Sequence, residues 1–199
     1  MTEHPLVKRL HGHRIVLASG SPRRKRFFEE LGLPFEIRLK PMVEDFPEQL
    51  KGEAIASYLA ELKASVHLAD LAKNEILITS DTVVWHKGRS LAKAADRHEA
   101  EAMLKTLSSD WHEVITAVCF SRQQGQKTVS ATTKVKFATL SQAEIDYYIQ
   151  QCAPFDKAGA YGIQEWLGLI GIEAISGSYT NVVGLPTQLV YKTLMDMAP

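Results

Sequence analysis

The chain has 199 residues, 45% of them apolar, which is enough for one full hydrophobic core or for two small lobes that share a cleft. Lys and Arg number 23, as do Asp and Glu, and the resulting zero formal charge argues against a protein that coats nucleic acid. The ordinary shares of charged and aromatic residues argue against disorder, and the two cysteines argue against a disulfide scaffold or a structural zinc site.

The N-terminal half of the chain is predicted to alternate between strands and helices. In the turn after the first strand, Ser21 is a typical N-cap and Pro22 suits the first helical position, while Gly32 ends that helix. The apolar residues of the next helix recur at helical spacing. The expected order is strand 14–18, helix 22–31, strand 35–39, loop 40–51, helix 53–71, strand 76–79 and hairpin 83–92.

The C-terminal half is predicted to contain the longest strands. Asp96 with Glu99, and Ser141 with Glu144, have the spacing of capped helix starts. Alternating strands and helices indicate an α/β protein, and long strands joined as a hairpin indicate a mixed sheet with flanking helices. The expected order is a helix from residue 96, strands 113–121 and 128–137, a helix from residue 141, loop 156–164, strand 169–175, loop 177–185 and a last helix from residue 186.

The run SGSPRR at residues 19–24 lies between a predicted strand and a predicted helix. The first amides of such a helix point outward with partial positive charge, and two arginines in the same turn add bidentate donors, so the run suits a phosphate. Two alternatives stay open. The helix can simply be capped with a solvated basic face, or the basic residues 23–26 can form a nucleic-acid patch, which the zero net charge disfavours.

Other residues invite a chemical interpretation, each with a plainer alternative. Asp81 follows an apolar strand, where ligands of α/β proteins usually bind, or it makes a local turn. Glu44 and Asp45 offer oxygen ligands for Mg²⁺ or Mn²⁺. Lys63 lies at or near the buried face of its helix, and Lys93 follows a strand. Each of these charges can equally be solvated or form a weak surface pair.

The segment DKAGAYGIQ at residues 156–164 combines small residues with a terminal glutamine. Small residues permit close approach of a ligand, and the amide of Gln164 offers a donor and an acceptor that match the edge of a base. A tight loop packed against a sheet is the alternative, and the segment GSYTNVVGLP at 177–186 has the same ambiguity.

Together with SDTV at 80–83, these segments occur in the order seen in the Maf-like nucleotide pyrophosphatases, and the resemblance covers residues 14–196. The segment 156–164 resembles the dTTP/UTP pyrophosphatase branch more than the branch that acts on 7-methyl-GTP. The chain departs from the family pattern at Ala92-Lys93-Ala94, where Gly-Lys-Pro is usual, at residues 108–112, and at residues 116–117.

The resemblance implies a fold, an activity and a set of site residues. The family fold is a mixed α/β structure, related to the ITPases, with two lobes around a central cleft. The activity is metal-dependent hydrolysis of a nucleoside triphosphate to the monophosphate and pyrophosphate. The matching positions are Asp81 as catalytic acid/base, Ser19, Arg23, Arg24, Lys63 and Lys93 at the phosphate end, Arg23, Thr82 and Gln164 at positions linked to base preference, and Asp45 with Asp81 at Mg²⁺ or Mn²⁺.

The expected protein is therefore a dTTP and UTP pyrophosphatase of one domain, with residues 1–13 as an N-terminal extension, and with a possible role in removing non-canonical nucleotides. A nucleotide-binding regulator of cell division without turnover is the alternative. No segment can span a bilayer and the N-terminus lacks the apolar run of a signal peptide, so a cytoplasmic protein without membrane or nucleic-acid partners is expected. The family resemblance also suggests a homodimer.

Overall fold

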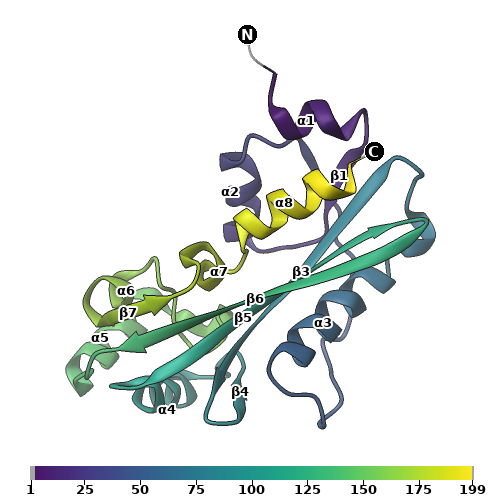
Figure 1. The fold of residues 1–199 in the computed structure, drawn as a ribbon. Helices are drawn as coiled ribbons and strands as arrows, with labels where there is room; N and C mark the ends of the chain where they lie inside the picture. The colour runs from purple at the N-terminus through teal and green to yellow at the C-terminus, as the bar shows by residue number, and fades with distance from the viewer. Residues whose placement is uncertain (1–2, 199) are drawn as a thin grey trace.

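The computed structural model describes residues 3–198, and in that range seven strands form one mixed sheet (Figure 1). The strand order is β2-β1-β3-β5-β6-β7, and β4 pairs with β3 outside this path. Pairing is parallel among β2, β1 and β3 and antiparallel elsewhere, which confirms the predicted mixed sheet. The strands are β1 (Arg14–Leu17), β2 (Phe35–Ile37), β3 (Glu75–His86), β4 (Arg89–Leu91), β5 (Trp111–Arg122), β6 (Gly125–Phe137) and β7 (Ile172–Ser176).

Eight α-helices flank this sheet in residues 3–198. The side chains of Ser21, Asp96 and Ser141 accept bonds from backbone N–H groups of the first turn, so the predicted N-caps are confirmed. In this range, none of the helices has the length and apolar character that crossing a membrane requires. The helices are α1 (Pro5–Leu10), α2 (Pro22–Glu30), α3 (Glu53–Ser65), α4 (Arg97–Leu107), α5 (Gln142–Cys152), α6 (Trp166–Gly171), α7 (Tyr179–Val183) and α8 (Thr187–Met197).

Three predicted elements are wrong in part. The helix expected over 53–71 ends at Ser65, where the Val66 carbonyl accepts a bond from Lys40 Nζ at 2.8 Å. The strand expected over 169–175 begins only at β7, because the residues before it form α6. A short apolar run does not distinguish a buried helix from a strand. The loop expected over 177–185 contains α7, whose N-cap is Ser178.

The core lies in two lobes that share the long strands. Figure 1 shows α1, α2 and α8 gathered at one end of these strands, which we call the first lobe, and α4, α5 and α6 at the other end, the second lobe. Helix α3 packs on the opposite face of the sheet from α8. The predicted N-terminal extension is part of the first lobe from residue 3 onward, because Leu6 and Leu10 pack with Val190 and Leu194 of α8.

The strand β3 changes partners along one of its edges. Residues 75–78 pair with β1 and residues 84–86 pair with β4, whereas residues 77–85 pair with β5 along the other edge. Residues 79–83 therefore have an open edge in the described structure, and Asp81 lies in the middle of a continuous strand. The prediction that Asp81 follows a strand end is wrong. Ligands of α/β sheets bind at such points of topological change, so this open edge is a candidate place for a site.

An ion cluster joins the first lobe to β3. Glu75 is only 2% exposed, and its carboxylate accepts bonds from Arg14 at 2.8 Å, from both Nη atoms of Arg38 at 2.9 and 3.0 Å, and from the backbone of Ala72 at 3.0 Å. The bonds from Arg38 are the largest cause that lowers the pKa of Glu75 to about 2. The carboxylate thus contributes stability above its unfolded pKa of 4.5, and this stability is lost as the pH falls toward 2.

We expect Glu75→Gln to unfold more easily than the wild type by about 2 kcal/mol at pH 7, because hydrogen bonds to charged groups contribute about 1.5–3 kcal/mol. The difference should shrink as the pH falls toward 2 and approach zero below it, where the wild-type carboxylate is also protonated. Urea unfolding at several pH values measures both effects. The control is Glu36→Gln, a half-exposed partner of Arg38 that should change little. A Glu75→Gln difference that is independent of pH would contradict this role.

Candidate active site

A cavity of about 1000 Å³ opens at the free edge of β3, between the two lobes. Its walls come from the start of α2, the face of α3, the middle of β3, the end of β4 and the loops around residues 40–46, 156–164 and 182–184. A volume of this size lies at the upper end of ordinary ligand sites, which are about 300–1,000 Å³. The cavity therefore accommodates a ligand of nucleotide size.

A lysine between two carboxylates occupies the α3 side of the cavity. Lys63 Nζ lies 2.5 Å from Asp81 Oδ1 and 3.2 Å from Glu44 Oε1. The side chains of Lys63 and Asp81 are only 15% and 12% exposed, so their positions are fixed by packing and by each other. Asp81 Oδ2 makes no protein hydrogen bond within residues 3–198. This second oxygen is available to a water molecule or a ligand.

Arg24 is the centre of the α2 side of the cavity. Its Nε donates to the Gly184 carbonyl at 2.9 Å, and Nη1 donates to the Ser80 carbonyl at 2.9 Å and to Ser19 Oγ at 3.4 Å. Nη2 donates to Thr82 Oγ1 at 3.1 Å. The Ser80 carbonyl is free for Arg24 because β3 has no partner strand there.

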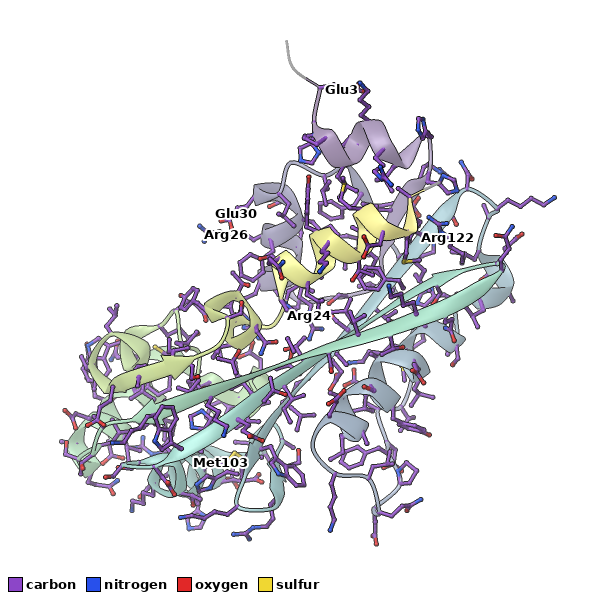
Figure 2. The ribbon with its side chains drawn as sticks, viewed as in Figure 1. Glu3, Arg24, Arg26, Glu30, Met103 and Arg122 are labelled. Atoms are coloured by element: carbon purple, nitrogen blue, oxygen red, sulfur yellow. The ribbon has the colours of Figure 1, made fainter. Side chains whose placement is uncertain are left out.

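The charge of Arg24 is held in place by its surroundings. Burial lowers the pKa of its guanidinium, and the negative charge of Asp81 acts in the opposite direction. An arginine stays protonated in proteins, so this cation remains at the N-terminal turn of α2. Figure 2 shows Arg24 beneath the junction of α7 and α8, consistent with its bond to Gly184.

One ion pair connects the two walls across the cavity, and two more hold the loop of the second lobe. Arg23 of α2 lies 3.2 Å from Asp156, which belongs to the loop of the second lobe. Lys157 Nζ lies 2.6 Å from Asp156 and 3.0 Å from Glu165, and the Lys157 side chain is only 9% exposed. The backbone of Lys93 pairs with Ala158, which ties the same loop to the segment after β4.

Cations outnumber carboxylates in the cavity by six to three. In a chain of zero net charge, this surplus is a local feature that suits a polyanionic ligand. The cations are Arg23, Arg24, Lys40, Lys63, Lys93 and Lys157, and the carboxylates are Glu44, Asp81 and Asp156.

The family described as Maf-like protein matches residues 14–197 of this chain. The chain belongs to the Maf-like family. A protein of Christiangramia forsetii is 52% identical over 192 residues, covering 96% of this chain and 98% of its own. A Bacteroides fragilis protein is 45% identical over 193 residues, covering 96% and 100%. Both relatives are named dTTP/UTP pyrophosphatase. The crystal structure of a dITP/XTP pyrophosphatase of Mycobacterium abscessus aligns with 64% of this chain and 75% of its own at 20% identity and a TM-score of 0.38.

All but one of the site residues predicted for this Maf-like chain line the cavity. Asp45 is the exception: it is exposed, and its carboxylate accepts a bond from the backbone of Phe46 at 2.9 Å. Its neighbour Glu44 reaches Lys63 instead. The lining residues are Ser19, Arg23, Arg24, Lys63, Asp81, Thr82, Lys93 and Gln164.

Sequence reasoning missed three further lining residues of the Maf-like site. Lys157 is buried beside Asp156, and its only signal was its place in the 156–164 segment. Lys40 and His67 also line the cavity, from a loop and from the turn after α3. Neither carries a local pattern, because loop residues meet a site through tertiary packing alone.

The donors at the α3 side fit a hard divalent cation. Lys63 pairs with Oε1 of Glu44 and Oδ1 of Asp81, so the second oxygen of each carboxylate is left to another cation. Mg²⁺ is usually held by one or two carboxylates together with substrate phosphates and water. Within residues 3–198 no cluster of three or more His, Cys, Asp or Glu side chains is placed to hold a metal. The two carboxylates suit an ion that arrives with the substrate.

Proposed function

We propose that this protein hydrolyses nucleoside triphosphates, dTTP and UTP foremost, to the monophosphate and pyrophosphate. The observation that carries the proposal is the cationic surplus of the cavity around the Lys63–Asp81 pair. A nucleoside triphosphate has about four negative charges, which catalysis must neutralise by positioned cations. The names of the curated relatives supply the expected bases.

In this mechanism Asp81 acts on the attacking water. Lys63 holds Oδ1 at 2.5 Å, so that Oδ2 is presented to the cavity and accepts the proton of the water. The water attacks the α-phosphorus, and pyrophosphate leaves. Arg24 and Arg23, at the N-terminal turn of α2, orient the triphosphate. A divalent cation held by Glu44 and Asp81 would neutralise charge on the phosphates when bound.

The base is proposed to bind near Gln164, away from Arg24. The Gln164 side chain is exposed in the cavity wall and makes no protein hydrogen bond among residues 3–198, so its carboxamide can rotate to suit either order of donor and acceptor. The amide then adds affinity for every pyrimidine and does not by itself distinguish uracil from cytosine. dTTP and UTP differ only by a methyl group, worth about 0.8 kcal/mol if it is fully buried.

We expect Gln164→Ala to lower kcat/KM by about 5- to 10-fold for dTTP, UTP and CTP alike, because one hydrogen bond contributes about 1 kcal/mol. Steady-state kinetics with the three nucleotides measures the three ratios. A loss confined to dTTP and UTP would show that Gln164 reads the base in a fixed orientation.

The assay that tests the proposed function measures pyrophosphate release from a panel of canonical and modified nucleoside triphosphates, with Mg²⁺ or Mn²⁺ present. The panel includes 7-methyl-GTP and non-canonical pyrimidines, which tests a role in removing unwanted nucleotides. Hydrolysis of dTTP and UTP to stoichiometric monophosphate and pyrophosphate is expected. Tight nucleotide binding without pyrophosphate release would overturn the proposal in favour of a regulator.

A further inference from the structure

We propose that Thr116 and Asn181, which do not line the cavity, are positioning residues for Arg24. The inference rests on the proposed function, in which Arg24 binds the triphosphate. Thr116 is completely buried on β5, opposite Thr82 of β3, and Asn181 is completely buried on α7. Both belong to a chain of hydrogen bonds that ends on the guanidinium.

Only one assignment of donors and acceptors satisfies all the hydrogen bonds in this chain. Thr116 Oγ1 lies 3.2 Å from the Asn181 carbonyl, which can only accept, so Thr116 uses its single hydroxyl proton there. The bond of 2.9 Å between the two threonine hydroxyls then requires Thr82 as donor. Thr82 Oγ1 in turn accepts from Nη2 of Arg24 at 3.1 Å. All three contacts therefore run from Arg24 through Thr82 and Thr116 to the Asn181 carbonyl.

Helix α7 closes this chain into a ring. The Asn181 amide donates to the Val114 carbonyl of β5 and to Thr133 Oγ1 of β6, both at 2.9 Å, which fixes α7 on the sheet. At the end of the same helix, the Gly184 carbonyl accepts from Arg24 Nε at 2.9 Å. One short helix thus holds Arg24 directly through Gly184 and indirectly through the two threonines. The segment 177–186, whose sequence alone left its role open, thus serves to position Arg24.

In the described part of the chain, these bonds leave one N–H group of Arg24 free to donate to a ligand. A guanidinium has five N–H groups in a rigid plane, and four of them are engaged by Gly184, Ser80, Ser19 and Thr82. The fifth belongs to Nη2, the nitrogen that donates to Thr82. Because the plane is rigid, the four bonds together set the direction of this remaining N–H, and the bond to Thr82 is the one made by the same nitrogen. Thr116 helps to maintain that direction by accepting the hydrogen bond from the Thr82 hydroxyl, which leaves the Thr82 oxygen to accept from Arg24.

The test replaces the Thr116 hydroxyl by a methyl group of similar volume in Thr116→Val, and restores it in Thr116→Ser. The control is Thr79→Val, because Thr79 is equally buried and donates to the Ala60 carbonyl at 2.6 Å, away from Arg24. Both valine variants should lower the Tm. We expect only Thr116→Val to raise the KM for dTTP, by about tenfold, and Thr116→Ser to return it to within twofold of the wild type. Partial unfolding lowers the measured kcat and leaves KM unchanged.

A second readout does not require turnover. In ¹⁵N NMR spectra of the arginine side chains, a guanidinium held by several bonds shows slowed rotation of its Nη groups. We expect this slow rotation for Arg24 in the wild type, Thr79→Val and Thr116→Ser, and faster rotation in Thr116→Val. An inactive wild type with this NMR pattern would refute the proposed function and leave the positioning intact. Unchanged KM and unchanged Arg24 rotation in Thr116→Val would overturn the inference.

Discussion

Asp81→Asn is expected to fold as the wild type does and to lose on the order of 10²–10⁴-fold in kcat for dTTP, because an amide cannot accept a proton from the attacking water. The asparagine keeps the shape of the side chain, and its Oδ1 can still accept the bond from Lys63. Glu44 remains as the second partner of Lys63, so the buried cation is not left alone. Pyrophosphate release at saturating dTTP, together with the Tm, measures both parts of this expectation.

The matched control is Asp146→Asn, which removes an exposed carboxylate on α5 that pairs with Arg97 outside the cavity. It should leave kcat unchanged. If Asp81→Asn keeps a kcat near that of the wild type, Asp81 is not the base. If it loses activity only because it unfolds, its Tm falls along with kcat, and the residual folded protein retains the wild-type kcat.

Removal of divalent metal is expected to abolish hydrolysis, and either Mg²⁺ or Mn²⁺ should restore it. The reason is the donor set: Glu44 and Asp81 offer carboxylate oxygens, which hard cations prefer. EDTA titration followed by addition of each metal measures the dependence. Full activity in the presence of excess EDTA would contradict it.

Two variants show which loop acid serves the metal. Glu44→Gln should raise the Mg²⁺ concentration that gives half-maximal activity by at least about tenfold, since even the loss of a residue that only orients a metal ligand lowers metal affinity by roughly 10–100-fold. Asp45→Asn should leave that concentration unchanged, because Asp45 does not line the cavity and its carboxylate accepts a bond within its own loop. The reverse result would support the assignment of Asp45 that the family resemblance implied.

Local features of the fold were predictable from the residues. The caps at Ser21, Asp96 and Ser141 act within one turn of helix, and the Lys87-Gly88 turn acts between adjacent strands. Such signals need only a few neighbouring residues, so they survive in any tertiary context. The order of four motifs carried the family resemblance, and with it most of the residues that line the cavity.

Longer-range features required the folded chain. Asp81 and its neighbour Thr82 point to opposite faces of β3. Both line the same cavity only because β3 changes its partner strand there and leaves its edge open. The choice between Glu44 and Asp45 depends on where an irregular loop crosses α3, and adjacent acids in a loop carry no periodic signal. The network from Arg24 to Asn181 joins residues 157 positions apart, and its geometry exists only once α7 packs on the sheet. Local propensity acts over a few residues, whereas a site is assembled by long-range packing that propensity does not encode.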